Sequence, residues 1–155
     1  MAQPLFDISE LDGDNPLVDI AGIEAVNPHR GHMRMLDGIL KVDPETYEMA
    51  AFKDVRADEF WVAGHFPERA LFPGVLMVEA AAQLASYVMM TVYGHQLVGF
   101  AGIDKVKFRA PVVPGDRLYI LGQQQDMRPR RCISQMQGIV NGKICFEAKV
   151  TGMPI

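Results

Sequence analysis

The sequence predicts an α+β domain in which one long buried helix is wrapped by a curved antiparallel sheet of about six strands. Two features predict this fold class. Residues 75–90 are apolar apart from three positions, as expected of a helix that is enclosed on most sides. After residue 94 the apolar period changes to two, and short strand-like runs alternate with turn residues, which is typical of sequential antiparallel strands.

The chain divides into two parts of different character. Residues 1–16 are polar and acidic and are expected to form a flexible lead-in, whereas residues 17–155 are expected to form a single domain. The strongest turn signal is Asn141-Gly142, a pair typical of a tight hairpin. In chain order we expect a short helix over residues 17–26, strands over 33–42 and 47–55, the long helix from 75 to about 93, and strands over 103–109, 117–125, 133–140 and 143–151.

The composition is that of an ordinary globular protein and argues against several classes of function. Of the 155 residues 49% are hydrophobic and 22% charged, and the net charge of −4 disfavours nucleic acid as a partner. Cys132 and Cys145 have neither metal-ligand spacing nor the pattern of a disulfide framework, so we expect reduced thiols in a cytoplasmic protein. No secretory signal is predicted. Glu79 and Gln83 interrupt the long apolar helix, which favours a buried helix over a membrane span.

The most informative residues are one histidine and one glutamate. His65 stands just before a proline-rich turn, and Glu79 lies inside the apolar helix on one stripe with Gln83 and Ser86. Burying an unpaired carboxylate costs several kcal/mol, so such a group either has a partner or marks a site. The structural alternatives are a Glu79 paired with a nearby cation and a His65 that belongs to the core. Together the two side chains provide a general base and a carboxyl group that burial can keep protonated.

Three separated blocks carry a resemblance to a known family. They closely resemble, in the same order, the sequence signature of the 3-hydroxyacyl-acyl carrier protein dehydratases of the FabZ type. The blocks are Pro28-His29-Arg30 with Leu36-Asp37, the run from Gly64 to Gln83, and residues 102–116, and Asn141-Gly142-Lys143 with Glu147-Ala148 fits the closing hairpin.

The resemblance implies a hot-dog fold and a homodimer, often a trimer of dimers, with the acyl chain in a tunnel at the dimer interface. It implies His65 as the catalytic base and Glu79 as the acid, the two meeting from opposite protomers, and it implies neither cofactor nor metal. The Gly74 amide would hold the thioester carbonyl, and the Leu71 carbonyl would orient the His65 ring. The tunnel would be lined by Phe66, Phe72, Pro73 and Gln83.

The expected reaction is dehydration of (3R)-hydroxyacyl-acyl carrier protein to the trans-2-enoyl product, in fatty acid biosynthesis or a related acyl-carrier pathway. A hot-dog thioesterase and a non-catalytic acyl-binding homologue are the alternatives, and glutamate at position 79 lowers the expectation of isomerase activity. The chain departs from the family over Gly31–Gly38, where a Tyr-Pro pair and an Asp-Arg pair are expected, and at Ala70 and Phe72. These departures bear on substrate length and oligomer contacts more than on the reaction.

The acyl carrier protein that the resemblance implies is strongly acidic, and local basic groups can steer such a partner. The alternative is a solvated strand edge, where lysine discourages aggregation. His29 and His32 are spaced like metal ligands on a helix, but Pro28 and Gly31 argue against a helix there, and we expect no metal site. The candidate carrier-protein residues are Lys105, Lys107 and Arg109 on one strand and Arg128, Arg130 and Arg131 at one turn.

Overall fold

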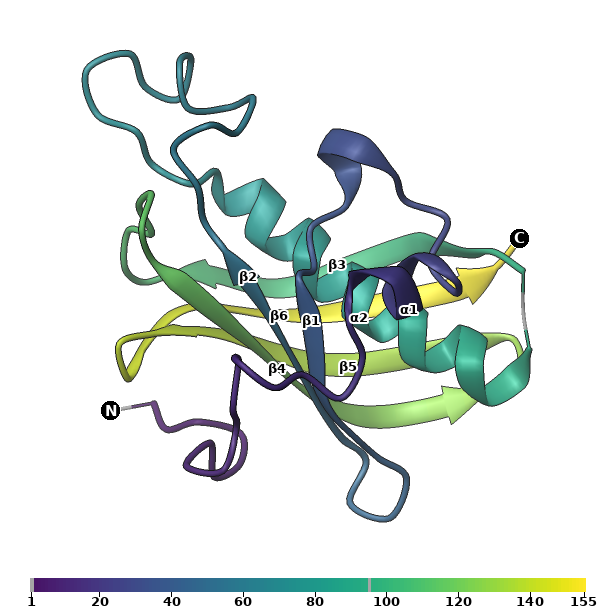
Figure 1. The fold of residues 1–155 in the computed structure, drawn as a ribbon. Coiled ribbons are helices and arrows are strands. Elements are labelled where there is room, and N and C mark those ends of the chain that lie inside the picture. Colours follow the sequence, from purple (N-terminus) through teal and green to yellow (C-terminus); the bar gives the residue numbers. More distant parts are fainter. Residues whose placement is uncertain (1, 95) are drawn as a thin grey trace.

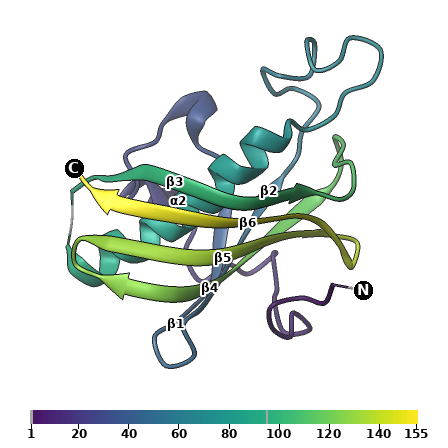
Figure 2. The same cartoon turned by 180° about the vertical axis from the view of Figure 1, so that it is seen from behind.

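The computed structural model describes residues 2–94 and 96–155 and confirms the α+β hot-dog fold. A six-stranded antiparallel sheet of order β1-β2-β4-β5-β6-β3 curves around one long helix, α2 (Figure 1). Seen from behind, β3, β6, β5 and β4 form one continuous face with α2 beyond it (Figure 2). The elements are α1 Ile20–Glu24, a 3-10 turn Gly31–Met33, β1 Gly38–Asp43, β2 Glu48–Asp54, α2 Gly74–Tyr93, β3 Val98–Phe108, β4 Arg117–Arg128, β5 Arg131–Val140 and β6 Lys143–Pro154.

The long helix α2 forms where the sequence predicts it. Pro73 takes the N-cap position, and Gly94 ends the helix in the left-handed conformation (φ 68°), its N–H donating to the carbonyl of Met90. By length and composition α2 could cross a membrane, but 67% of its most apolar window is buried within the fold. It is therefore the core helix of the domain, packed against β2–β6.

The hairpin between β5 and β6 confirms the Asn141-Gly142 prediction. Both residues have positive φ, 49° and 76°, as a type I′ turn requires. Val140 and Lys143 form the first pair of the ladder, which then runs to Cys132 and Gly152. Both strands are longer than expected because the pairing continues to the far end of the sheet.

Strand β3 differs from the regular alternation expected around Lys105. Asp104 pairs with Lys149 and Lys107 with Glu147, so two residues of β3 oppose one residue of β6, and Lys105 has a φ of 51°. This bulge shifts the alternation of faces by one residue. Ile103 pairs with a buried residue of β6 and so lies on the core face of the strand. In a regular strand Val106, three residues later, would point to the opposite face, but the bulge turns it back and it packs against the core.

The segment before β1 is less regular than the sequence predicts. The expected strand over residues 33–42 begins only at Gly38, because the Met35 N–H donates to the Gln83 side chain (3.0 Å) instead of to a ladder. The expected helix over residues 17–26 shortens to α1, which is capped by the Asp19 carboxylate.

Residues 2–16, expected as a flexible lead-in, contact the outer face of the sheet. The Leu5 N–H donates to Oε1 of Gln137 (2.8 Å). Apolar side chains of the segment pack against a buried cluster of the outer face, namely Leu5, Phe6, Ile8 and Leu11 against Ala50, Leu121 and Ile139. The division of the chain at residue 16 stays a prediction.

Candidate active site

His65 lies in the long loop between β2 and α2, which projects from the body of the domain (Figure 1). Its backbone is fixed on both sides, because its N–H donates to the Trp61 carbonyl (2.8 Å) and its carbonyl accepts from the Leu71 N–H (2.8 Å). Nδ1 of the ring lies 2.7 Å from the Leu71 carbonyl oxygen. A carbonyl can only accept, so Nδ1 carries the proton. In the neutral ring Nε2 is then unprotonated and available to accept a proton.

A cavity of about 510 Å³ opens beside His65, within the size range of small-molecule sites. Its walls are the start of α2 and the segment that follows β3. Gly74 is the first residue of α2, so its amide has no partner within the helix and lies at the positive end of the helix dipole. A Cβ at Gly74 would stand 2.7 Å from the Phe108 ring, so the close approach of the two walls requires glycine.

The aromatic residues expected in the tunnel lie in different surroundings. Phe72 lines the His65 cavity but is 3% exposed, with its ring against Trp61 at a centroid distance of 5.3 Å. Phe66 is half exposed and stacks on the His65 ring (centroids 4.2 Å apart), and it does not line this cavity. Pro73 lines the cavity, whereas Gln83 lines a second one.

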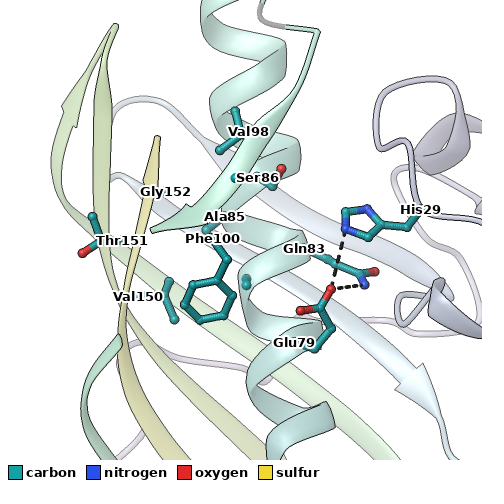
Figure 3. A pocket seen from close by; sticks show the side chains of 12 residues that line it. His29, Glu79, Gln83, Ala85, Ser86, Val98, Phe100, Val150, Thr151 and Gly152 are labelled. Atoms are coloured by element: carbon teal, nitrogen blue, oxygen red, sulfur yellow. Dashed lines mark hydrogen bonds and ion pairs between the residues drawn. The ribbon is translucent and has the colours of Figure 1, made fainter. Parts of the chain in front are cut away.

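Glu79 lines that second, smaller cavity of about 50 Å³, between α2 and the strands β3 and β6 (Figure 3). Its Oε1 accepts a hydrogen bond from Nε2 of Gln83 (2.9 Å), one turn further along the helix. Gln83 is buried, donates to the Met33 carbonyl (2.7 Å) and accepts from the Met35 N–H (3.0 Å). The segment before β1 is therefore bound to α2 at the polar stripe that the sequence predicts.

His29 is the residue of this site that sequence reasoning missed. Its Nε2 lies 3.6 Å from Oε1 of Glu79, across 50 residues of sequence (Figure 3). Burial lowers the pKa of His29, while the Glu79 carboxylate raises it and Arg30 lowers it. The available signal was its position in the first block of the resemblance. Among residues 2–94 and 96–155, no group of three or more His, Cys, Asp or Glu side chains could hold a metal ion.

Within one chain the structure does not bring His65 and Glu79 to a common cavity, since each lines its own. The expectation that the two residues meet from opposite protomers therefore stays a prediction.

The candidate carrier-protein residues form two separate groups. Arg109 lines the His65 cavity and donates through Nε to Glu147 (2.7 Å), near the start of α2.

Arg128 and Arg131 flank the turn between β4 and β5. Both donate to the Asp126 carboxylate (2.9 and 2.6 Å) and lower its pKa. That turn lies near the end of α2, because the Tyr93 hydroxyl donates to the Met127 carbonyl. The 20-residue helix is about 30 Å long, so the two groups lie at opposite ends of the domain. The exposed residues Lys105 and Lys107 belong with the first group and Arg130 with the second.

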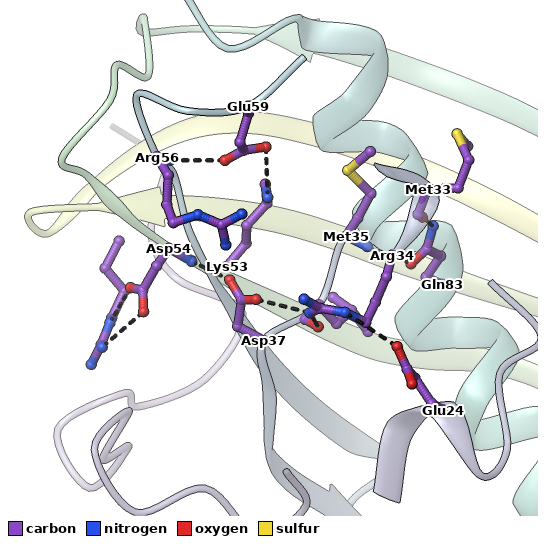
Figure 4. A network of polar contacts seen from close by, with 12 residues as sticks. Glu24, Met33, Arg34, Met35, Asp37, Lys53, Asp54, Arg56, Glu59 and Gln83 are labelled. Carbon is purple, nitrogen blue, oxygen red and sulfur yellow. Dashed lines mark hydrogen bonds and ion pairs between the residues drawn. The ribbon is translucent and has the colours of Figure 1, made fainter. Parts of the chain in front are cut away.

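The unusual Gly31–Gly38 segment takes part in a polar network beside the His65 loop (Figure 4). Arg34 donates to Asp37 Oδ1 (2.9 Å), and Asp37 Oδ2 accepts the Asp54 N–H (2.7 Å). Further along, the buried pair Lys53–Glu59 (3.0 Å) fixes the beginning of the His65 loop. Burial raises the pKa of Glu59, but hydrogen bonds from the Arg56 N–H, from Trp61 and from Lys53 lower it on balance.

Comparison with known proteins identifies the family. The family model for a FabA-like domain matches residues 27–149. The 3-hydroxyacyl-[acyl-carrier-protein] dehydratase FabZ of Streptococcus pneumoniae is 36% identical over 137 residues, which cover 87% of this chain and 96% of the relative. FabZ of Aliivibrio fischeri is 35% identical over 143 residues, covering 88% and 93%.

Solved structures show the same fold at low identity. The dehydratase heterocomplex ApeI:P from Xenorhabdus doucetiae superimposes with a TM-score of 0.72 at 14% identity, covering 86% of this chain and 90% of the other. A hypothetical thioesterase protein with coenzyme A from S. pneumoniae gives 0.57 at 12% identity, covering 76% and 84%. The fold is thus shared with a dehydratase complex and with a hypothetical thioesterase, and sequence similarity gives the family. The chain belongs to the FabA-like family, and its curated relatives include FabZ-type 3-hydroxyacyl-acyl carrier protein dehydratases.

Proposed function

We propose that this protein dehydrates (3R)-hydroxyacyl-acyl carrier protein to trans-2-enoyl-acyl carrier protein in fatty acid biosynthesis or a related acyl-carrier pathway. The observation that carries the proposal is the fixed tautomer of His65. Its Nδ1 is bonded to the Leu71 carbonyl, so Nε2 offers a lone pair, and His65 and Gly74 line the same cavity. Identity to FabZ proteins over most of the chain supports the same reaction.

The elimination needs a base at C2 and an acid at C3 of the acyl chain. Nε2 of His65 takes the C2 proton, and the electron pair of the C–H bond moves toward the thioester carbonyl, whose oxygen becomes negative. The Gly74 N–H stabilises that oxygen, a role worth roughly 3–4 kcal/mol for one such donor. As the pair returns to form the C2–C3 double bond, the C3–O bond breaks, and the proton of the Glu79 carboxyl converts the leaving hydroxide into water.

A second copy of the chain would complete the site. β3 is an edge strand of the sheet with Phe100, Ile103 and Phe108 exposed, and two such edges can pair. The Glu79 cavity lies against β3, so such pairing would bring Glu79 of one copy toward the His65 cavity of the other. We propose a cytoplasmic homodimer with shared active sites, three of which can assemble into a trimer of dimers.

Arg109 is the candidate carrier-protein residue that the fold places at the His65 cavity. We propose that it and the neighbouring Lys105 and Lys107 receive the acidic acyl carrier protein as it delivers the acyl chain. The arginines at the other end of α2 lie away from this cavity, and their part in binding the carrier protein stays a prediction.

The test is intact-mass spectrometry of 3-hydroxyacyl-acyl carrier protein incubated with the wild type and with the His65→Ala and Glu79→Gln variants. Loss of one water by the wild type alone supports the proposal. Release of the acyl group as a free acid would establish a thioesterase instead. No change over a range of chain lengths would leave an acyl-binding protein.

A further inference from the structure

The Glu79 carboxyl group is held by contacts to one of its two oxygens. Oε1 accepts the Gln83 hydrogen bond and is also the atom that faces Nε2 of His29, at 3.6 Å (Figure 3). The orientation of the Gln83 amide is fixed, because its own oxygen accepts the Met35 N–H and its nitrogen must therefore point to Glu79. Oε2 of Glu79 is left as the oxygen that can carry a transferable proton.

The turn that carries His29 is bound to the same part of α2. The Asn27 side chain is buried and donates to the Gln83 backbone carbonyl (3.0 Å). The Arg30 guanidinium donates to the carbonyls of Asn27 (2.7 Å) and His29 (2.8 Å), which closes the turn on itself. The backbone that carries the imidazole is therefore held in place relative to α2, the helix from which Glu79 projects.

The charge around His29 suits a neutral ring. The charged groups that act on it are Glu79 from α2 and Arg30 from its own turn, while the other residues lining the cavity, from α2, β3 and β6, are uncharged. A cationic His29 would stabilise Glu79 as a carboxylate, which has no proton to give. Burial, which lowers the pKa of His29, opposes that state. Its Nδ1 is buried and has no hydrogen-bond partner among the described residues, which argues against a path for protons through the ring.

We propose that His29 is a positioning residue for Glu79, which together with Gln83 holds Oε1 so that the Oε2 proton points to the leaving hydroxyl. This inference rests on the proposed function, in which Glu79 is the acid. His29 itself touches no substrate atom and exchanges no proton. Its removal should therefore lower kcat and leave KM nearly unchanged, since the carrier protein is proposed to bind beside Arg109, at the other cavity.

The experiment compares steady-state dehydration of a 3-hydroxyacyl-acyl carrier protein by the wild type, His29→Leu and His29→Gln between pH 5 and 9. Misplacement of a reacting group by about 1 Å can cost about 100-fold, so we expect His29→Leu to lower kcat about 10- to 100-fold with KM within about twofold. The Gln side chain places an N–H donor near the position of Nε2 and should restore most of kcat. Because every variant keeps the His65 base, the Gln variant should lose only the part of the acidic decline that protonation of His29 adds in the wild type.

The matched control is His32→Leu, a change of the same kind in the same segment. His32 is exposed and its ring contacts Phe60, away from Glu79, so its kcat should equal that of the wild type. The folded fraction of each variant is measured by circular dichroism, and kcat is expressed per folded enzyme.

Two results would overturn the proposal: wild-type kcat and pH profile in His29→Leu, or a His29→Gln variant as slow as His29→Leu, which would require a proton exchanged by the imidazole. Failure of the proposed function looks different. In that case the wild type does not dehydrate the substrate, or Glu79→Gln is as fast as the wild type.

Discussion

Replacing Gly74 by alanine tests whether activity requires the close approach of Gly74 to the Phe108 ring in the wall of the His65 cavity. The added Cβ would lie 2.7, 2.8 and 2.9 Å from three atoms of the Phe108 ring, all closer than real side chains approach. Overpacking in a rigid core costs about 1–3 kcal/mol, but Phe108 is the last residue of β3 and is 53% exposed within one chain, so its ring can turn away from Gly74 at the end of the strand. We therefore expect the free energy of unfolding to fall by less than about 1 kcal/mol.

Activity should respond much more strongly than stability. Phe108 and Gly74 line the same cavity, so movement of the ring changes the space beside Nε2 of His65, and the helix start that presents the Gly74 amide shifts with it. If the amide is displaced from the developing oxyanion, part of its stabilisation of the transition state, roughly 3–4 kcal/mol in all, is lost. We expect kcat/KM of Gly74→Ala to fall about 10- to 100-fold.

The assay is a double-mutant cycle with Phe108→Ala, scored by kcat/KM for dehydration and by urea unfolding. Because Phe108→Ala removes the colliding ring, Gly74→Ala should cost much less activity in that background than in the wild type. Wild-type kcat/KM in the single Gly74→Ala variant would refute the reasoning. So would an equal loss in both backgrounds, since the loss would then not arise from the contact with the ring.

Two further predictions concern stability. Burial raises the pKa of Cys145 to about 12, whereas an exposed thiol titrates near about 8.5. The full contribution of Cys145 is thus present below about pH 8.5. As pH rises from there to about 12 the unfolded chain ionises first, and the free energy of unfolding falls by up to about 5 kcal/mol. Urea unfolding at pH 8, 9.5 and 11 should show this fall in the wild type relative to Cys145→Ala, and parallel curves would contradict it. Glu59→Gln leaves Lys53 buried without its carboxylate and should lower the free energy of unfolding in urea by about 3–5 kcal/mol. The exposed pair Arg56–Asp58 provides a control, since Asp58→Asn should change the free energy of unfolding by less than about 1 kcal/mol.

Local signals in the sequence predicted those parts of the fold that depend on local chemistry. The apolar run of α2 and the Asn141-Gly142 turn each determine their conformation within a few residues, and both are confirmed. The bulge at Lys105 could not be predicted, because it arises from the register of β3 against β6. The irregular path before β1 likewise depends on Gln83, a side chain 48 residues away from Met35.

The candidate site divides in the same way. The contact between His65 and Leu71 spans six residues and follows from the turn that both belong to. The approach of His29 to Glu79 requires the whole segment before β1 to fold back onto α2, and no periodicity in the sequence reports such a contact. Polar residues at helical spacing, Glu79 and Gln83, marked where that segment would attach.

The separation of His65 and Glu79 into different cavities of one chain has a genetic consequence. In the proposed dimer each chain supplies a base to one site and an acid to the other. A chain lacking only the histidine and a chain lacking only the glutamate would each be inactive alone. Mixed together, they would form heterodimers in which one site receives both intact residues and the other receives neither, so that about one quarter of all sites would regain function after random exchange. Two defective alleles of such a gene would complement each other.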